Sequence, residues 1–66
     1  MSTKDQFLAE CEAFIAASGV TASSFGRKSL GDPSFITRLR RGADVSANTM
    51  DKVRAFMQQN EVLSLL

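Results

Sequence analysis

Residues 21–42 read TASSFGRKSLGDPSFITRLRRG, and this stretch decides the fold. Thr21 is a preferred N-cap residue, and it predicts a helix from about Ala22 to Ser29. Gly26 falls inside that helix, where glycine costs about 0.5–1 kcal/mol relative to alanine. A small residue kept at such a position usually has a packing reason. We therefore expect another helix backbone to approach closely at Gly26.

A second helix follows after a short turn at residues 30–32. Asp32 is a good N-cap, and Pro33 suits the first helical position, where its missing N–H has no intrahelical partner to lose. Gly42 supplies the stop after position 40 or 41, because glycine readily adopts the left-handed conformation found after helices. The stretch thus predicts two helices joined by a tight turn, at about residues 22–41.

The second helix has two different faces. On a helical wheel of about 100° per residue, Ile36 and Leu39 point in one direction with Phe35 on their flank. The opposite face carries Ser34, Thr37, Arg38 and Arg41, and Arg40 lies at the border. One face is therefore expected in the core, and the other is polar, basic and free of acidic residues.

Two further helices enclose this unit. One is predicted from about Lys4 to Ser18, with Thr3 as N-cap and a buried face of Phe7, Leu8, Cys11, Phe14 and Ile15. The other is predicted from about Ala47 to Gln59, with Ser46 as N-cap and a buried face of Met50, Val53, Phe56 and Met57. No strand pattern competes, so the fold class is all-α.

The C-terminal segment 61–66 is unusually apolar for a chain end. It contains Val62, Leu63, Leu65 and Leu66. Two interpretations remain open: the segment folds back onto its own core, or it packs against a second protomer. The two are compatible with each other.

Composition excludes several functions. The chain has 66 residues, enough for one domain, and it has no histidine, the commonest general base and imidazole metal ligand. Cys11 is the single cysteine, which rules out an internal disulfide or a thiolate metal site, and burial is its expected role. No phosphate-binding loop, signal peptide or apolar run of about 20 residues is present. We expect a cytoplasmic, non-enzymatic protein without cofactor, metal or small-molecule ligand.

The charge is unevenly distributed although the net charge is only +1. Residues 27–54 carry seven basic and three acidic residues, whereas residues 1–26 carry one basic and three acidic residues. Clustered Lys and Arg on one part of a small domain are typical of an anion-binding face.

Residues 22–41 resemble the helix-turn-helix unit of the lambda-repressor-like family, also called the Cro/C1 or XRE family. The apolar anchors of that unit correspond to Phe25, Ile36 and Leu39, its small residue at the helix crossing to Gly26, and its following glycine to Gly42. The turn glycine, Gly31, comes one residue later than is usual, so the turn is expected to be reshaped. The resemblance implies a compact domain of four to five helices. It also implies that the second helix of the helix-turn-helix unit, at 33–41, reads the major groove of double-stranded DNA.

The resemblance also implies roles for single residues. Candidate base contacts are Ser34, Thr37, Arg38 and Arg41, residue types that suit base edges. Candidate phosphate contacts are Ser23, Arg27, Lys28, Arg40, Asn48, Thr49 and Lys52. A transcriptional regulator acting as a homodimer, associated with the nucleoid, is the implied function, with the C-terminal apolar residues as dimer contacts. The alternative is a helical protein-interaction module that uses those same C-terminal residues.

Overall fold

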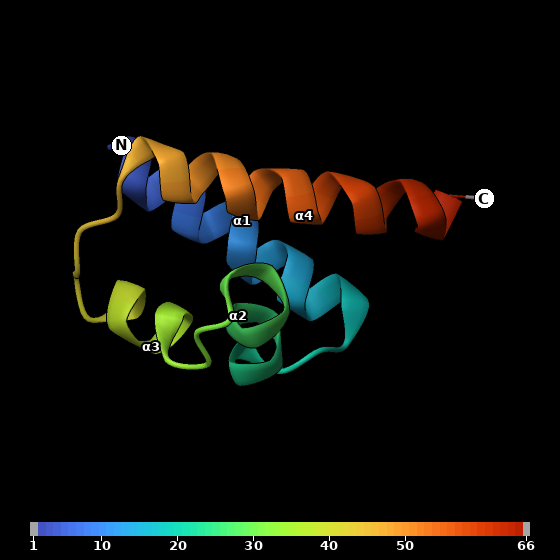
Figure 1. The fold of residues 1–66 in the computed structure, drawn as a ribbon, viewed down its shortest axis with the longest axis horizontal. Coiled ribbons are helices and arrows are strands. Elements are labelled where there is room, and N and C mark those ends of the chain that lie inside the picture. Colours follow the sequence, from blue (N-terminus) through green and yellow to red (C-terminus); the bar gives the residue numbers. More distant parts are fainter. Residues whose placement is uncertain (1, 66) are drawn as a thin grey trace.

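The computed structural model describes residues 2–65, and the side chains of residues 2–60. It contains four helices, α1 (Thr3–Ser18), α2 (Ala22–Leu30), α3 (Phe35–Arg40) and α4 (Ala47–Leu65), and no strand in the described residues. α1 and α4 pass side by side, joined by an ion pair between Glu10 and Arg54, and α2 and α3 pack beneath them (Figure 1). The expected all-α fold is confirmed, with four helices.

The turn between α2 and α3 is locked by a backbone contact at Gly26. The N–H of Asp32 donates to the carbonyl of Gly26 at 3.1 Å. A Cβ atom placed on Gly26 would lie only 2.2 Å from the carbonyl oxygen of Asp32. The expected close approach is therefore confirmed, but the approaching backbone belongs to the turn and not to a helix. Gly31 then ends α2 in the left-handed region, with φ of 71°.

Helix α3 begins later than the sequence predicted. Asp32 does accept a hydrogen bond through a carboxylate oxygen, from the N–H of Ser34 at 3.0 Å. The N–H of Phe35 donates to the carbonyl of Asp32 at 3.2 Å, which closes a turn before the helix starts. The predictions of Asp32 as N-cap and of Pro33 as the first helical residue were wrong. Ser34 is the N-cap of α3, because the backbone of Asp32 is held against α2 and the chain must turn before the helix can begin.

The outer helices also differ from expectation at their ends. Ser2, not Thr3, caps α1: its backbone is extended and its hydroxyl accepts from the N–H of Asp5 at 3.1 Å. Ser46 caps α4 as predicted, accepting from the N–H of Thr49 at 3.2 Å.

Helix α4 does not end near Gln59 but continues to Leu65. No glycine or proline follows Gln59, so nothing in the sequence stops the helix there. Up to Leu65 the backbone therefore extends the helix and does not fold back (Figure 1). The side chains of residues 61–66, including the expected dimer contacts, lie outside the described part of the structure.

All four helices contribute to one core. Its buried members are Phe7, Cys11, Phe25, Phe35, Ile36, Leu39, Val53 and Met57. Around it, the rings of Phe14, Phe25 and Phe56 form a mutual cluster with centroid separations of 5.6, 5.7 and 6.1 Å. Such ring pairs add about 0.5–1.5 kcal/mol each beyond their buried area, which helps a domain this small. The predicted burial of Cys11 is confirmed, and burial raises the pKa of its thiol from 9.0 to about 12.

The close contact at Gly26 predicts whether Gly26→Ala raises or lowers the free energy of unfolding. Gly26→Ala should lower the free energy of unfolding by about 1–3 kcal/mol, the usual cost of forcing atoms into a packed site. At an unconstrained helix position the same change would instead stabilise by about 0.5–1 kcal/mol. Urea unfolding followed by circular dichroism measures the difference, and Ser23→Ala on the exposed side of α2 is the control. A stabilised Gly26→Ala variant would contradict the packing described above.

The thiol of Cys11 predicts a pH dependence of stability. In the unfolded chain it ionises near its ordinary pKa of 9.0, but in the folded protein only near 12, so rising pH favours the unfolded state between these values. Below pH 9 its contribution is intact. By pH 10 the stability advantage of wild type over Cys11→Ala should shrink by about 1.4 kcal/mol relative to pH 8. Urea melts of both proteins at each pH check this, and an advantage that stays constant would refute it.

Candidate nucleic-acid interface

Helix α3 divides its residues between core and solvent as the sequence predicted. Phe35, Ile36 and Leu39 are buried, and they anchor the helix against the rest of the domain. The residues of the outer face, Ser34, Thr37, Arg38 and Arg41, are all exposed. Thr37 and Arg38 lie on α3 itself, Ser34 is its N-cap and Arg41 its C-cap. The four candidate base contacts thus form one accessible polar strip.

Arg38, one of the four residues of this strip, forms an ion pair with Asp32 in the turn before α3. Its guanidinium contacts one carboxylate oxygen of Asp32, while the other carboxylate oxygen holds the N–H of Ser34. The Arg38 side chain nevertheless remains 56% exposed. In the sequence, Asp32 is predicted only as a cap, because a separation of six residues across a turn is not a helical neighbour distance. No sequence signal identified this pair.

Arg40 makes a different contact. Its guanidinium donates to both carboxylate oxygens of Glu12 on α1, at 2.9 and 2.5 Å. These hydrogen bonds lower the pKa of Glu12 and raise the pKa of Arg40. Arg40 therefore ties α3 to α1, and its assignment as a phosphate contact remains a prediction.

A hollow of about 340 Å³ lies between α3 and the start of α4. Arg38, Thr49 and Lys52 all line it. The structure thereby brings candidate base and phosphate contacts from separate helices to one place. Thr49 also accepts a hydrogen bond from the Ser46 hydroxyl at 3.0 Å, and Asn48 is exposed beside it.

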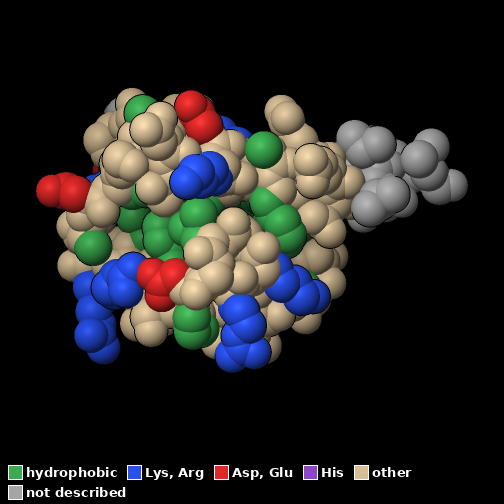
Figure 2. Space-filling model, in the orientation of Figure 1, with side chains coloured by type: hydrophobic (Ala, Val, Ile, Leu, Met, Phe, Trp, Pro, Cys, Tyr) green, Lys and Arg blue, Asp and Glu red, His purple; other side chains and the backbone are tan. Residues whose placement is uncertain are grey.

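Basic side chains are concentrated along the edge formed by α2 and α3 (Figure 2). Ser23, Arg27 and Lys28 on α2 are all exposed. Within the part of the chain that the structure describes, the cations that form no ion pair are Arg27, Lys28, Arg41 and Lys52. All four belong to the candidate set, so the unpaired positive charge gathers around α2, α3 and the start of α4.

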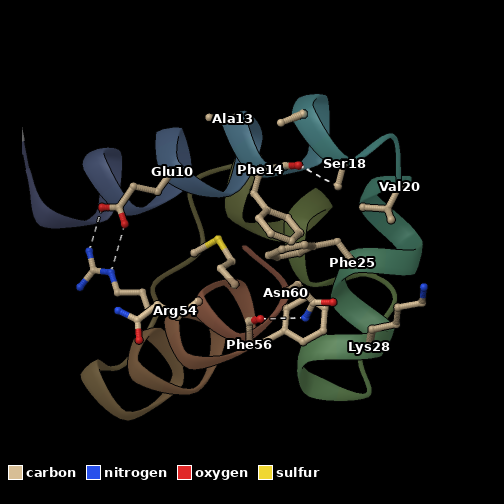
Figure 3. A pocket seen from close by; sticks show the side chains of 13 residues that line it. Glu10, Ala13, Phe14, Ser18, Val20, Phe25, Lys28, Arg54, Phe56 and Asn60 are labelled. Carbon is tan, nitrogen blue, oxygen red and sulfur yellow. Dashed lines mark hydrogen bonds and ion pairs between the residues drawn. The ribbon is translucent and has the colours of Figure 1, made fainter. Parts of the chain in front are cut away.

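A second surface feature lies where α1, α2 and α4 meet. This α1–α4 groove has a volume of about 750 Å³, and its apolar lining includes Ala13, Phe14, Ala17, Val20, Phe25 and Phe56. The ion pair of Glu10 and Arg54 stands at one end and Lys28 at the other (Figure 3). No sequence pattern predicts the groove, because it depends on how three helices cross.

Two further kinds of feature, a metal site and a membrane span, were sought in the described residues. No group of three or more Cys, Asp or Glu side chains there could hold a metal ion. None of the helices, within the same residues, combines the length and the apolar character needed to cross a bilayer.

The candidate interface consists of two helices joined by a tight turn, an exposed strip on α3, and unpaired cations on both sides of that strip. Comparison of the chain with protein-family models, with curated proteins and with solved structures found no significant match.

Proposed function

We propose that this domain binds double-stranded DNA in a sequence-specific manner and regulates transcription, with α3 in the major groove. The observation that carries the proposal is the exposed strip of Ser34, Thr37, Arg38 and Arg41 on a helix anchored by buried residues. Arginine can donate two parallel hydrogen bonds to guanine, and serine or threonine can pair with several bases. A rigidly held helix presents these groups at fixed positions.

The unpaired cations support contacts with the phosphate backbone. Arg27 and Lys28 lie on α2, and Lys52 lies on α4, so they flank α3 in the sequence and in the fold. Phosphate contacts orient a protein on the duplex, and base contacts specify the sequence. With about four phosphates neutralised per protomer, the logarithm of affinity should fall with the logarithm of salt concentration, with a slope of about −3.6 for each bound protomer.

We further propose that the domain acts as a homodimer. One short helix reads few base pairs, and two copies place their reading helices about 34–36 Å apart on one face of DNA. Four of the six C-terminal residues 61–66 are large and aliphatic in sequence, and α4 continues past the α1–α4 groove to Leu65. A second copy is the occupant that we assign to the groove and the neighbouring end of α4.

A protein-interaction module is the second candidate function. The α1–α4 groove favours it, because an apolar groove between helices suits an amphipathic helix of a partner. The two candidates differ in one simple measurement. Binding to random duplex DNA at about 50 mM salt is expected for the first candidate and not for the second.

Removal of single cations should separate base reading from backbone contact. Arg38→Ala should weaken binding to a selected site by about 1–3 kcal/mol and relax the preference at one base pair. Lys52→Ala should weaken binding to every sequence alike and reduce the salt slope by about 1. Fluorescence anisotropy with sites selected from a random duplex pool measures both effects.

The two variants are matched controls, because each removes one positive charge from the same hollow. An Arg38→Ala variant that keeps the wild-type preference at every base pair would show that α3 does not read the major groove through this residue. Absence of duplex binding by wild type at low salt would reject DNA binding altogether and favour the interaction module.

Self-association should depend on the α1–α4 groove. Ala17→Glu puts a carboxylate into the groove lining, so it should raise the dissociation constant of the dimer at least about tenfold, the effect of 1.4 kcal/mol. Ala16→Glu, on the exposed surface of α1 outside the lining, is the control. Sedimentation equilibrium measures both. Equal association of the two variants would exclude the groove from the dimer interface.

A further inference from the structure

Asp32, in the turn before α3, is held through both its main chain and its side chain. Its backbone N–H donates to the carbonyl of Gly26 at 3.1 Å, and its own carbonyl accepts from Phe35 at 3.2 Å. One carboxylate oxygen accepts from the N–H of Ser34 at 3.0 Å. Main chain and side chain are thus fixed from α2 and from the start of α3. The second carboxylate oxygen is consequently presented at a defined place.

That second oxygen contacts the guanidinium of Arg38. The carboxylate is only 33% exposed, whereas the arginine side chain is 56% exposed. A guanidinium has five N–H donors in a planar fork, so one edge can be held while another edge stays open to a ligand. Asp32 therefore restrains Arg38 without covering it.

The pair has two consequences for an arginine that reads bases. Holding the side chain in advance reduces the rotamer freedom lost on binding, which favours a geometrically demanding bidentate contact. The adjacent carboxylate also offsets the positive charge of Arg38 and repels phosphates, which weakens binding that ignores sequence. Both effects increase the difference between a correct and an incorrect site.

We infer that Asp32 is a specificity-determining positioning residue, which aligns Arg38 for a base edge and suppresses sequence-independent DNA binding. This inference rests on the proposed function, and it adds a residue that does not itself contact the base. It also predicts that removal of a negative charge from the interface makes recognition worse, although affinity for DNA in general improves.

The test variant is Asp32→Asn, which keeps an oxygen acceptor for the N–H of Ser34 but removes the charge that holds Arg38. Affinity for random duplex DNA should rise. Discrimination between the selected site and a site changed at the base pair under Arg38 should fall by about 2- to 10-fold. Fluorescence anisotropy at fixed salt gives both values. If Asp32→Asn does not fold, Asp32→Ser replaces it, since a serine hydroxyl can also accept a hydrogen bond from the backbone N–H two residues later in a turn.

Asp44→Asn is the matched control. Asp44 lines the same hollow as Arg38, but it pairs with Lys4 at 3.7 Å. Its neutralisation also removes one negative charge from this surface, so affinity should rise for all duplexes alike while discrimination stays at the wild-type value. Equal loss of discrimination in Asp44→Asn and Asp32→Asn would overturn the inference.

A double-mutant cycle with Arg38→Ala separates positioning from a merely structural role. In the Arg38→Ala background, Asp32→Asn should cause no further loss of discrimination. A loss of the same size in both backgrounds would mean that Asp32 acts through the turn, and it would overturn the inference.

Comparison of wild type with Asp32→Asn also distinguishes failure of the role of Asp32 from failure of the proposed function. A wild-type protein that selects a site, combined with an Asp32→Asn variant that discriminates fully, rejects only the role of Asp32. A wild-type protein that binds no duplex rejects the proposed function together with this inference.

Discussion

The backbone contact between Gly26 and Asp32 is the constraint on which the helix-turn-helix depends. It joins α2 to the turn before α3 with a hydrogen bond of 3.1 Å and leaves no room for a Cβ atom. Because the turn is held against α2, the direction in which α3 leaves is held as well. The buried side chains of α3 then reach the core that α1 and α4 complete. Gly26 costs helix stability relative to alanine, but it permits the close contact that sets the direction of α3 relative to α2.

The three central arginines show how neighbouring side chains of one type acquire different roles. Arg40 is bound by Glu12 of α1 through two hydrogen bonds, so it connects helices that meet across the core. Arg38 is restrained by Asp32 yet remains accessible. Arg41 forms no ion pair within the described residues and caps α3 at its C-terminal end. The two carboxylate partners come from α1 and from the turn before α3. The cations without an ion pair within the described residues lie on α2, at the end of α3 and near the start of α4.

The small size of the domain explains its reliance on aromatic packing. Among the side chains that the structure describes, eight apolar ones are buried, and the cluster of Phe14, Phe25 and Phe56 extends the core toward the α1–α4 groove. At the other end of α1, Arg54 stacks on the ring of Phe7 at 5.5 Å while it pairs with Glu10. A single residue thus joins α4 to α1 by charge and by contact with an aromatic face. The core and the proposed reading face lie on different sides of α3, so changes on the exposed strip leave the packing intact.

The sequence by itself determined the number of helices, their buried faces and the polar strip of α3, because helical periodicity and end signals are local properties. It also predicted that Gly26 has a close backbone neighbour. That this neighbour is the carbonyl of Asp32, and that α3 therefore begins at Phe35, follows only from the tertiary structure. The pairing of each arginine was likewise decided by the fold, since Glu12 and Arg40 are 28 residues apart and no local pattern relates them. Local spacing states which residues share a face, whereas the crossing of helices determines which charges meet.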